Sequence, residues 1–295
     1  LRDLHSYSEK VSQARMLYSE LENSVVKLDL AMAIESMLPA LVSLAERAEG
    51  SEPEVIRLRE SMHSLIGDLS DEEDISAHFA HAILAERMEL IDAVQDPSSL
   101  PIVRRAPAFP IGRLWYGVVS PAFCLATIPW LDSYTEYAES AAALDWTRMR
   151  RALTMRPQTC QDAFACLIHP YDECFESSSY RFVNLYWGVA QQRMAVTALA
   201  VALFKIDNGR LPETLNELVP NYLPIVPLDP FSVDRATIRY RPNAFRPILY
   251  SIGPDGEDNE GKHPLNYYGS VDLDAKLDIP IFLDGPRPLP SLPGG

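Results

Sequence analysis

The uneven distribution of proline divides this 295-residue chain into two parts that favour different secondary structure. Residues 1–206 contain ten prolines, whereas the much shorter stretch 207–295 contains fourteen. Because proline ends or kinks helices and lacks a backbone N–H, the first part can be helical, and the second must be rich in turns and short strands. We therefore expect an α+β fold, with an N-terminal all-α helical domain over 1–176, a long connecting helix, and an α+β module over 177–295 that contains a small antiparallel sheet.

The spacing of apolar residues refines this expectation. Apolar residues recur at three- and four-residue steps in several stretches, which predicts helices over 17–32, 55–65 and 75–94. We expect another helix over 132–154. A last helix is expected from about Ser178 to Lys205, since Asp207-Asn208-Gly209 suits a left-handed helix cap. Short apolar stretches between turns predict strands over 237–240, 248–252 and 279–283.

Charge and motifs narrow the classes of function. The 26 basic and 41 acidic residues give a net charge of −15, so we expect no nucleic acid as a partner. The sequence lacks a P-loop, a G-x-G-x-x-G fingerprint and a G-x-S-x-G nucleophile elbow. Nucleotide-binding and serine-hydrolase chemistry therefore have no local support. The sequence leaves open whether the protein is an enzyme: a non-enzymatic protein is favoured, and a hydrolase-type enzyme with a site in the helical domain or at the domain junction is the alternative.

Two sequence features bear on the compartment. The apolar run 114–131 is at the lower length limit of a membrane span, but Pro121 and Pro129 favour a buried, broken segment. The chain starts at Leu1 with neither a methionine nor a targeting pattern. From this start we expect a form that lacks its N-terminal targeting segment, and that segment would be the membrane anchor.

Cysteine and histidine residues suggest metal sites that compete with simpler interpretations. A zinc site would use Cys160, Cys166, His169 and Cys174, but their gaps fit structural zinc poorly. One or two disulfides, which could include Cys124, are favoured, and buried free thiols are the remaining alternative. His78 and His81 could bind a metal from one helical face, although an ordinary histidine pair is the favoured interpretation.

An acidic stretch follows the second predicted strand. Residues 251–284 contain eight Asp or Glu and two Lys, and the tight turn Gly253-Pro254-Asp255-Gly256 precedes the first acidic cluster. Hard cations such as calcium need several oxygen ligands from a flexible loop. The two interpretations are a solvated acidic turn, which is favoured, and a calcium site.

The order of several short motifs resembles the globular module of type II secretion major pseudopilins. The matching pieces are the helix end and turn 198–212, residues 214–223, the Asp229-Pro230-Phe231 turn, the predicted strands, the turn 253–256 and the pair Asp278-Ile279. The resemblance covers about residues 180–284 and is strongest to uncharacterised envelope proteins of bacteria such as planctomycetes. It implies a small antiparallel sheet of pseudopilin type that follows the long connecting helix.

The resemblance also implies a ligand and a functional class. Major pseudopilins bind calcium in the loop after Gly-x-Asp-Gly, which corresponds here to Asp255, Asp258 and Asp278. The cofactor expected from the resemblance is therefore calcium. The expected function is that of a non-enzymatic structural or interaction protein on the periplasmic or outer-envelope side, with protein partners in the cell envelope and a link to secretion machinery.

Overall fold

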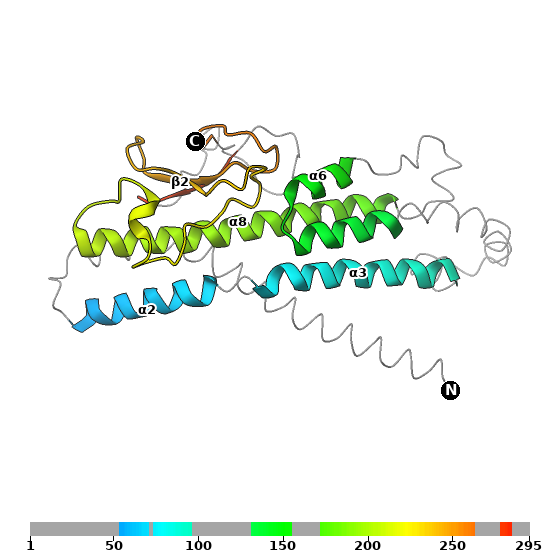
Figure 1. Cartoon of the computed structure of the whole chain (residues 1–295), viewed down its shortest axis with the longest axis horizontal. Helices are drawn as coiled ribbons and strands as arrows, with labels where there is room; N and C mark the ends of the chain where they lie inside the picture. Colours follow the sequence, from blue (N-terminus) through cyan, green and yellow to red (C-terminus); the bar gives the residue numbers. More distant parts are fainter. Residues whose placement is uncertain (1–52, 71–72, 96–130, 155–171, 263–277, 285–295) are drawn as a thin grey trace, which may run out of the picture. The chain divides into compact units, whose positions relative to one another are not determined.

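The computed structural model describes residues 53–70, 73–95, 131–154, 172–262 and 278–284 of the chain. Within them lie the helices α2 (Pro53–Ser70), α3 (Glu73–Gln95), α6 (Trp146–Thr154) and α8 (Asp172–Asn208) and the 3-10 helix η2 (Leu215–Leu218). The strands are β1 (Arg239–Arg241), β2 (Ile248–Ser251) and β3 (Ile279–Phe282) (Figure 1). The expected α+β class is confirmed.

The chain forms two compact units that do not follow the order of the sequence. The first unit contains the described residues 74–95, 131–154 and 172–182. The second unit contains the described residues 53–70, 73, 183–262 and 278–284. The division passes through α8 between Phe182 and Val183, and it assigns α2 to the second unit. The domain boundary at 176/177 that the sequence suggests also lies within α8 and stays a prediction.

The first unit contains a helical hairpin where the sequence suggested one helix over 132–154. Residues 131–142 are helical, and α6 starts anew at Trp146. Leu144 has a left-handed φ of 47°, and the Asp145 side chain accepts a hydrogen bond of 3.0 Å from the Arg148 N–H. The expectation of one helix was wrong because Asp145 caps a new one.

Aromatic side chains hold this hairpin together. Tyr137 is fully buried, and its hydroxyl donates a 3.3 Å hydrogen bond to the Ala152 carbonyl in α6. The centroid of its ring lies 4.9 Å from that of Phe182 in α8. On the outer side, the Arg148 guanidinium pairs with Glu136 at 2.9 Å. The hydrogen bond to Arg148 lowers the pKa of the Glu136 carboxyl, and burial opposes this shift only partly.

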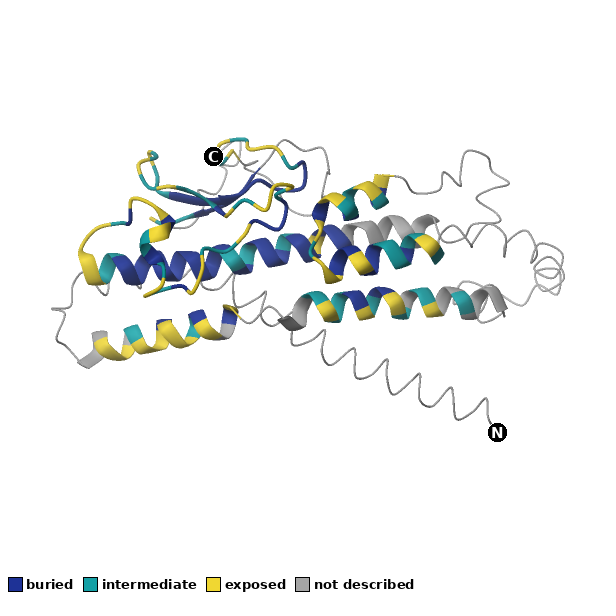
Figure 2. Ribbon diagram, viewed as in Figure 1, coloured by how far each residue is buried: buried dark blue, intermediate teal, exposed yellow. Residues whose placement is uncertain are grey.

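The second unit is built on the C-terminal part of α8. All residues from Met194 to Phe204 are buried, as Figure 2 shows by the dark colour of this helix. Residues Phe182–Asn208 are long and apolar enough to cross a membrane, but most of that stretch is buried within the fold, as in the core helix of a soluble protein. The helix starts six residues before the expected Ser178, at Asp172, and ends where expected, because Gly209 takes φ 68° and donates to the Lys205 carbonyl at 2.8 Å.

The three strands form an antiparallel sheet in the order β1-β2-β3. Tyr240 is paired with Leu249, and Leu249 in turn with Ile281, so the expected strands are confirmed with shifts of one or two residues. Leu249 and Ile281 are buried, and Figure 1 shows the sheet beside α8. The sheet and α8 thus share an apolar core, from whose edge the acidic loop emerges.

Candidate functional site

Two glycine-containing turns shape the loop that follows β2. Gly253 and Gly256 have φ values of 75° and 71°, which residues with a side chain rarely adopt, and the Gly256 N–H donates to the Gly253 carbonyl at 3.1 Å. In the second turn the Lys262 N–H donates to the Asn259 carbonyl at 3.2 Å, and Gly261 has φ 81°. A Cβ at Gly261 would also lie 3.1 Å from Ile248, so this position requires glycine.

The second turn brings the start of β3 back to the loop. The Asp278 N–H donates to the Lys262 carbonyl at 2.8 Å. Its carboxylate accepts hydrogen bonds from the Gly261 N–H at 2.6 Å and from the Asn259 N–H at 3.2 Å. Although Asp278 is separated from the turn by many residues of chain, it is therefore an integral part of the turn.

The other two predicted ligands lie in the same loop, and we call Asp255, Asp258 and Asp278 the aspartate cluster. Asp255 is buried and accepts from the Glu257 N–H at 3.2 Å and from the Asn259 side-chain amide at 3.1 Å. Asn259 therefore bridges Asp255 to Asp278. Sequence reasoning selected the three aspartates but did not identify this amide, because nothing in its spacing marks it.

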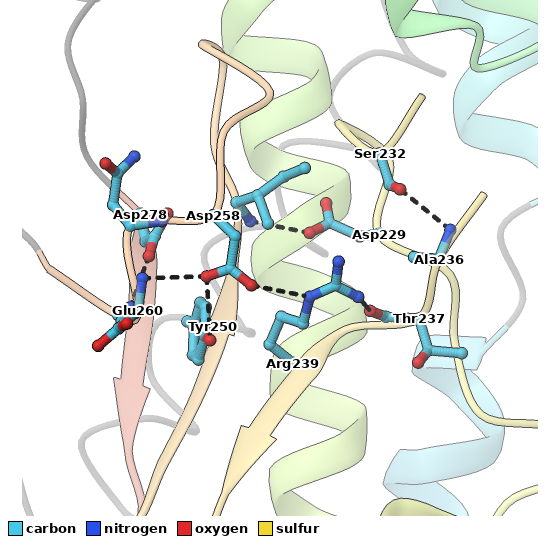
Figure 3. Close-up of polar contacts among 12 residues, drawn as sticks. Asp229, Ser232, Ala236, Thr237, Arg239, Tyr250, Asp258, Glu260 and Asp278 are labelled. Atoms are coloured by element: carbon cyan, nitrogen blue, oxygen red, sulfur yellow. Dashed lines mark hydrogen bonds and ion pairs between the residues drawn. The ribbon is translucent and has the colours of Figure 1, made fainter. Parts of the chain in front are cut away.

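Asp258 is the exposed member of the cluster and connects it to the sheet. Its carboxylate accepts hydrogen bonds from the Tyr250 hydroxyl at 3.1 Å, from the Glu260 N–H at 3.0 Å and from Arg239 Nε at 3.3 Å (Figure 3). Burial raises the pKa of the Asp258 carboxyl, but these hydrogen bonds outweigh burial and lower it. Burial raises the pKa of Tyr250 to about 12, and the charge of Asp258 and its hydrogen bond to the Tyr250 hydroxyl raise it too.

The electrostatic state of Asp278 shows the repulsion within the cluster. Its side chain is 2% exposed, and burial is the largest cause that raises its pKa to about 6. The negative charges of Asp258 and Asp255 raise it further, against the opposing hydrogen bonds from Gly261 and Asn259. A nearby cation would relieve both the desolvation and the repulsion, so this donor set suits a hard cation.

Other residues that the sequence suggested as metal ligands form no site that can be described. Among the described residues, the aspartate cluster and His78 and His81 included, no group of three His, Cys, Asp or Glu side chains is already arranged to hold an ion. Several of the residues that the sequence suggested lie outside the described residues: Cys124, Cys160, Cys166 and His169. The same holds for residues 114–130 of the apolar run. Cys174 belongs to α8, but its side chain is not among those described.

Asp229 is the buried carboxylate that fixes the loop to the sheet. It is 3% exposed and accepts hydrogen bonds from Ser251 Oγ at 2.7 Å, from the Ile252 N–H at 2.8 Å and from the Phe231 N–H at 3.0 Å. Burial raises its pKa despite these hydrogen bonds. Asp229 thereby holds the Asp229-Pro230-Phe231 turn to the end of β2, just before the aspartate cluster begins (Figure 3).

Comparison with protein-family models finds no match, and comparisons with curated proteins and with solved structures find no significant similarity.

Proposed function

We propose that this chain is a non-enzymatic structural or interaction protein of the cell envelope, whose second unit works as a pseudopilin-like module. One observation carries the proposal: the motifs of the resemblance occur in sequence order in one compact unit. The second unit contains the end of α8, the Asp229 turn, strands β1 to β3 and the aspartate cluster. Asp229 supports the proposal because its hydrogen bonds connect the turn motif directly to β2.

We further propose that the aspartate cluster binds calcium. The support is electrostatic, because the charges of Asp255 and Asp258 both raise the pKa of the buried Asp278 carboxyl. In the native fold the three carboxylates are held near one another, whereas they separate on unfolding. A cation that binds only the folded chain stabilises it, by about 2.7 kcal/mol at a hundredfold excess over the dissociation constant.

Thermal unfolding of the full chain tests the calcium proposal. We expect millimolar calcium to raise the midpoint of the wild-type chain relative to chelator, and to leave Asp258→Asn and Asp278→Asn almost unchanged. Asp278→Asn removes a buried, repelled charge but also leaves one of the two backbone N–H groups of Gly261 and Asn259 without its acceptor, so in chelator its midpoint should depend less on pH than that of wild type. Asp234→Asn, on an exposed residue outside the cluster, is the control that keeps the calcium response.

The result that contradicts the calcium proposal is a wild-type midpoint that calcium does not move. A response that survives in both cluster variants would also contradict it, because the ion would then bind elsewhere. The envelope role is tested by cell fractionation and chemical crosslinking of the protein in its source cells. We expect recovery in the envelope fraction with crosslinked protein partners, and recovery in the cytoplasm alone would contradict the proposal.

A further inference from the structure

Helix α2 reaches α8 from far away in the sequence and is held to it at two points. Arg59 Nη2 lies 2.8 Å from an oxygen of Asp207, close to the end of α8. Ten residues further along α2, the Leu69 carbonyl accepts a 2.5 Å hydrogen bond from Gln192 Nε2. The two helices therefore run antiparallel within the second unit.

The apolar part of this contact is narrow. Met62, Ile66 and Leu69 are buried at steps of four and three residues, which places them on the same face of α2 as Arg59. Figure 2 shows exposed residues along much of the rest of α2. Isolated helices of this length are marginal in water, so this single stripe decides whether α2 stays folded and attached.

Two buried polar atoms make the contact imperfect. Arg59 Nε and Gln192 Oε1 have no hydrogen-bond partner among the described residues, and both belong to side chains that join the helices. Gln192 is fully buried, between the half-buried Gln191 and Arg193 of α8. Opening the contact would let water reach both atoms, so their burial without partners favours detachment of α2.

Detachment would uncover an apolar helix that must be covered again. Residues 194–204 of α8 are buried on every side, and a helix apolar on all faces is stable in water only when packed. A fitting replacement needs apolar side chains spaced like Met62, Ile66 and Leu69, a cation for Asp207 and a carbonyl for Gln192. A second copy of this chain supplies all of these in its own α2.

We propose that α2 is a displaceable strap, and that its site on α8 accepts either the chain's own α2 or α2 of a second copy. Two copies can then associate by exchanging this helix. The exchange needs no new surface, because the contacts that hold α2 in one chain are the contacts that join two chains. Association by helix exchange does not depend on calcium binding.

Hydrogen exchange on the full wild-type chain tests whether the strap opens alone. We expect amides of α2 to exchange about a hundredfold or more faster than those of residues 194–204, as a locally opening segment does. Gly67→Ala should slow exchange in α2 without affecting the sheet, because alanine favours a helix and its Cβ meets no atom within 4 Å. Equal protection of α2 and α8 would overturn the proposal.

A peptide tests whether the site accepts α2 in trans. A labelled peptide of residues 53–70 should bind saturably to full chain carrying Met62→Asp, whose own strap cannot close. It should bind several-fold more weakly to wild-type chain, where α2 in cis competes. The same peptide with Ile66→Asp is the matched control and should bind neither chain.

Equal binding of the peptide to both chains, or no binding to a Met62→Asp chain that keeps its cooperative unfolding, would overturn the proposal. If Met62→Asp does not fold, sedimentation of wild-type chain replaces this test. We then expect a monomer–dimer equilibrium, with crosslinks between α2 of one copy and α8 of the other when differently labelled copies are mixed. A strictly monomeric wild-type chain, or a dimer without these crosslinks, would overturn it.

Discussion

At the scale of single residues, Asp229 and Asp278 are both almost fully buried, yet they serve different purposes. Asp229 accepts three hydrogen bonds that tie the Asp229-Pro230-Phe231 turn to β2. Asp278 closes the glycine-containing turn and faces the charges of two further aspartates. In each case burial is the largest influence and raises the pKa, so ionisation opposes folding at both positions.

The titration of Asp229 predicts how stability depends on pH. The pKa of Asp229 in the folded chain lies above the ordinary 3.8. The protonated carboxyl therefore adds fully to the stability of the fold below pH 3.8, and this contribution is lost as the pH rises through the raised pKa. Asp229→Asn cannot titrate, so its free energy of unfolding should fall less than that of wild type between pH 4 and pH 7. Urea unfolding at several pH values measures this difference in slope.

Asp234→Asn, which alters an exposed carboxyl, should keep the wild-type slope and serves as the control. Parallel pH profiles for wild type and Asp229→Asn would contradict the prediction. The variant should also lose stability at pH 4, by about 1–3 kcal/mol, because an amide NH2 cannot accept a hydrogen bond from a backbone N–H.

The candidate aspartates could be selected from the sequence because a Gly-x-Asp-Gly turn and an acidic-apolar pair are local patterns. The hydrogen bonds of Asp278 to Gly261 and Asn259 could not be predicted, since they depend on how β3 returns to the loop. Gln192 could not be predicted as a contact residue either, because its partner is a carbonyl 123 residues earlier.

At the scale of elements, the two edges of the sheet are protected in different ways. The Ile238 N–H donates to the Pro227 carbonyl at 3.1 Å, which covers the outer side of the chain as it enters β1. Just after β3, the Leu283 N–H donates inward to the Pro247 carbonyl at 3.0 Å. Since backbone groups alternate in direction along a strand, Pro280 occupies an outward position, where it offers no N–H to a further strand.

Replacing this proline should weaken the edge of the sheet. Pro280 is buried, so Pro280→Val adds an outward N–H inside the fold, and we expect the free energy of unfolding to fall by about 1–3 kcal/mol. Urea unfolding measures the effect. Pro224→Val, at an exposed proline outside the sheet, is the control; if both variants unfold like wild type, the added N–H at position 280 is not costly.

Periodicity and turn residues predicted the strands and the end of α8 because each depends on a few neighbouring residues. The start of α8 was misplaced, and the break between residues 142 and 146 was missed, since apolar residues on both sides of it continue a helical spacing. Only the left-handed Leu144 and the cap by Asp145 separate the two helices.

At the scale of the whole molecule, α8 is the element shared by both units. Its N-terminal part packs with Tyr137 in the first unit, and its C-terminal part packs with the sheet and α2 in the second. The change in proline content indicated where the sheet begins. It could not indicate that α2 joins the second unit, because sequence composition carries no information on which distant helices meet.

Helix α2 should contribute to the stability of the second unit. Residues 178–295 expressed alone lack Met62, Ile66 and Leu69, and full burial of each such side chain is worth about 1.5–3 kcal/mol. The uncovered face of α8 should then make this fragment less stable and prone to self-association. Fusing residues 53–70 to its N-terminus should restore a monomer with a higher unfolding midpoint.

The geometry of α2 sets the linker for this fusion. The Leu69 carbonyl accepts a hydrogen bond from Gln192, and residues 178 and 192 of α8 are fourteen residue steps, or about 21 Å, apart. A flexible Gly/Ser linker of about fifteen residues, with a typical end-to-end distance of about 19–23 Å, reaches this far without strain. The same fusion with Ile66→Asp should behave like the bare fragment, because the linker and added length are unchanged while the apolar stripe is broken. A bare fragment that is monomeric and as stable as the fusion would mean that the sheet alone suffices to cover α8.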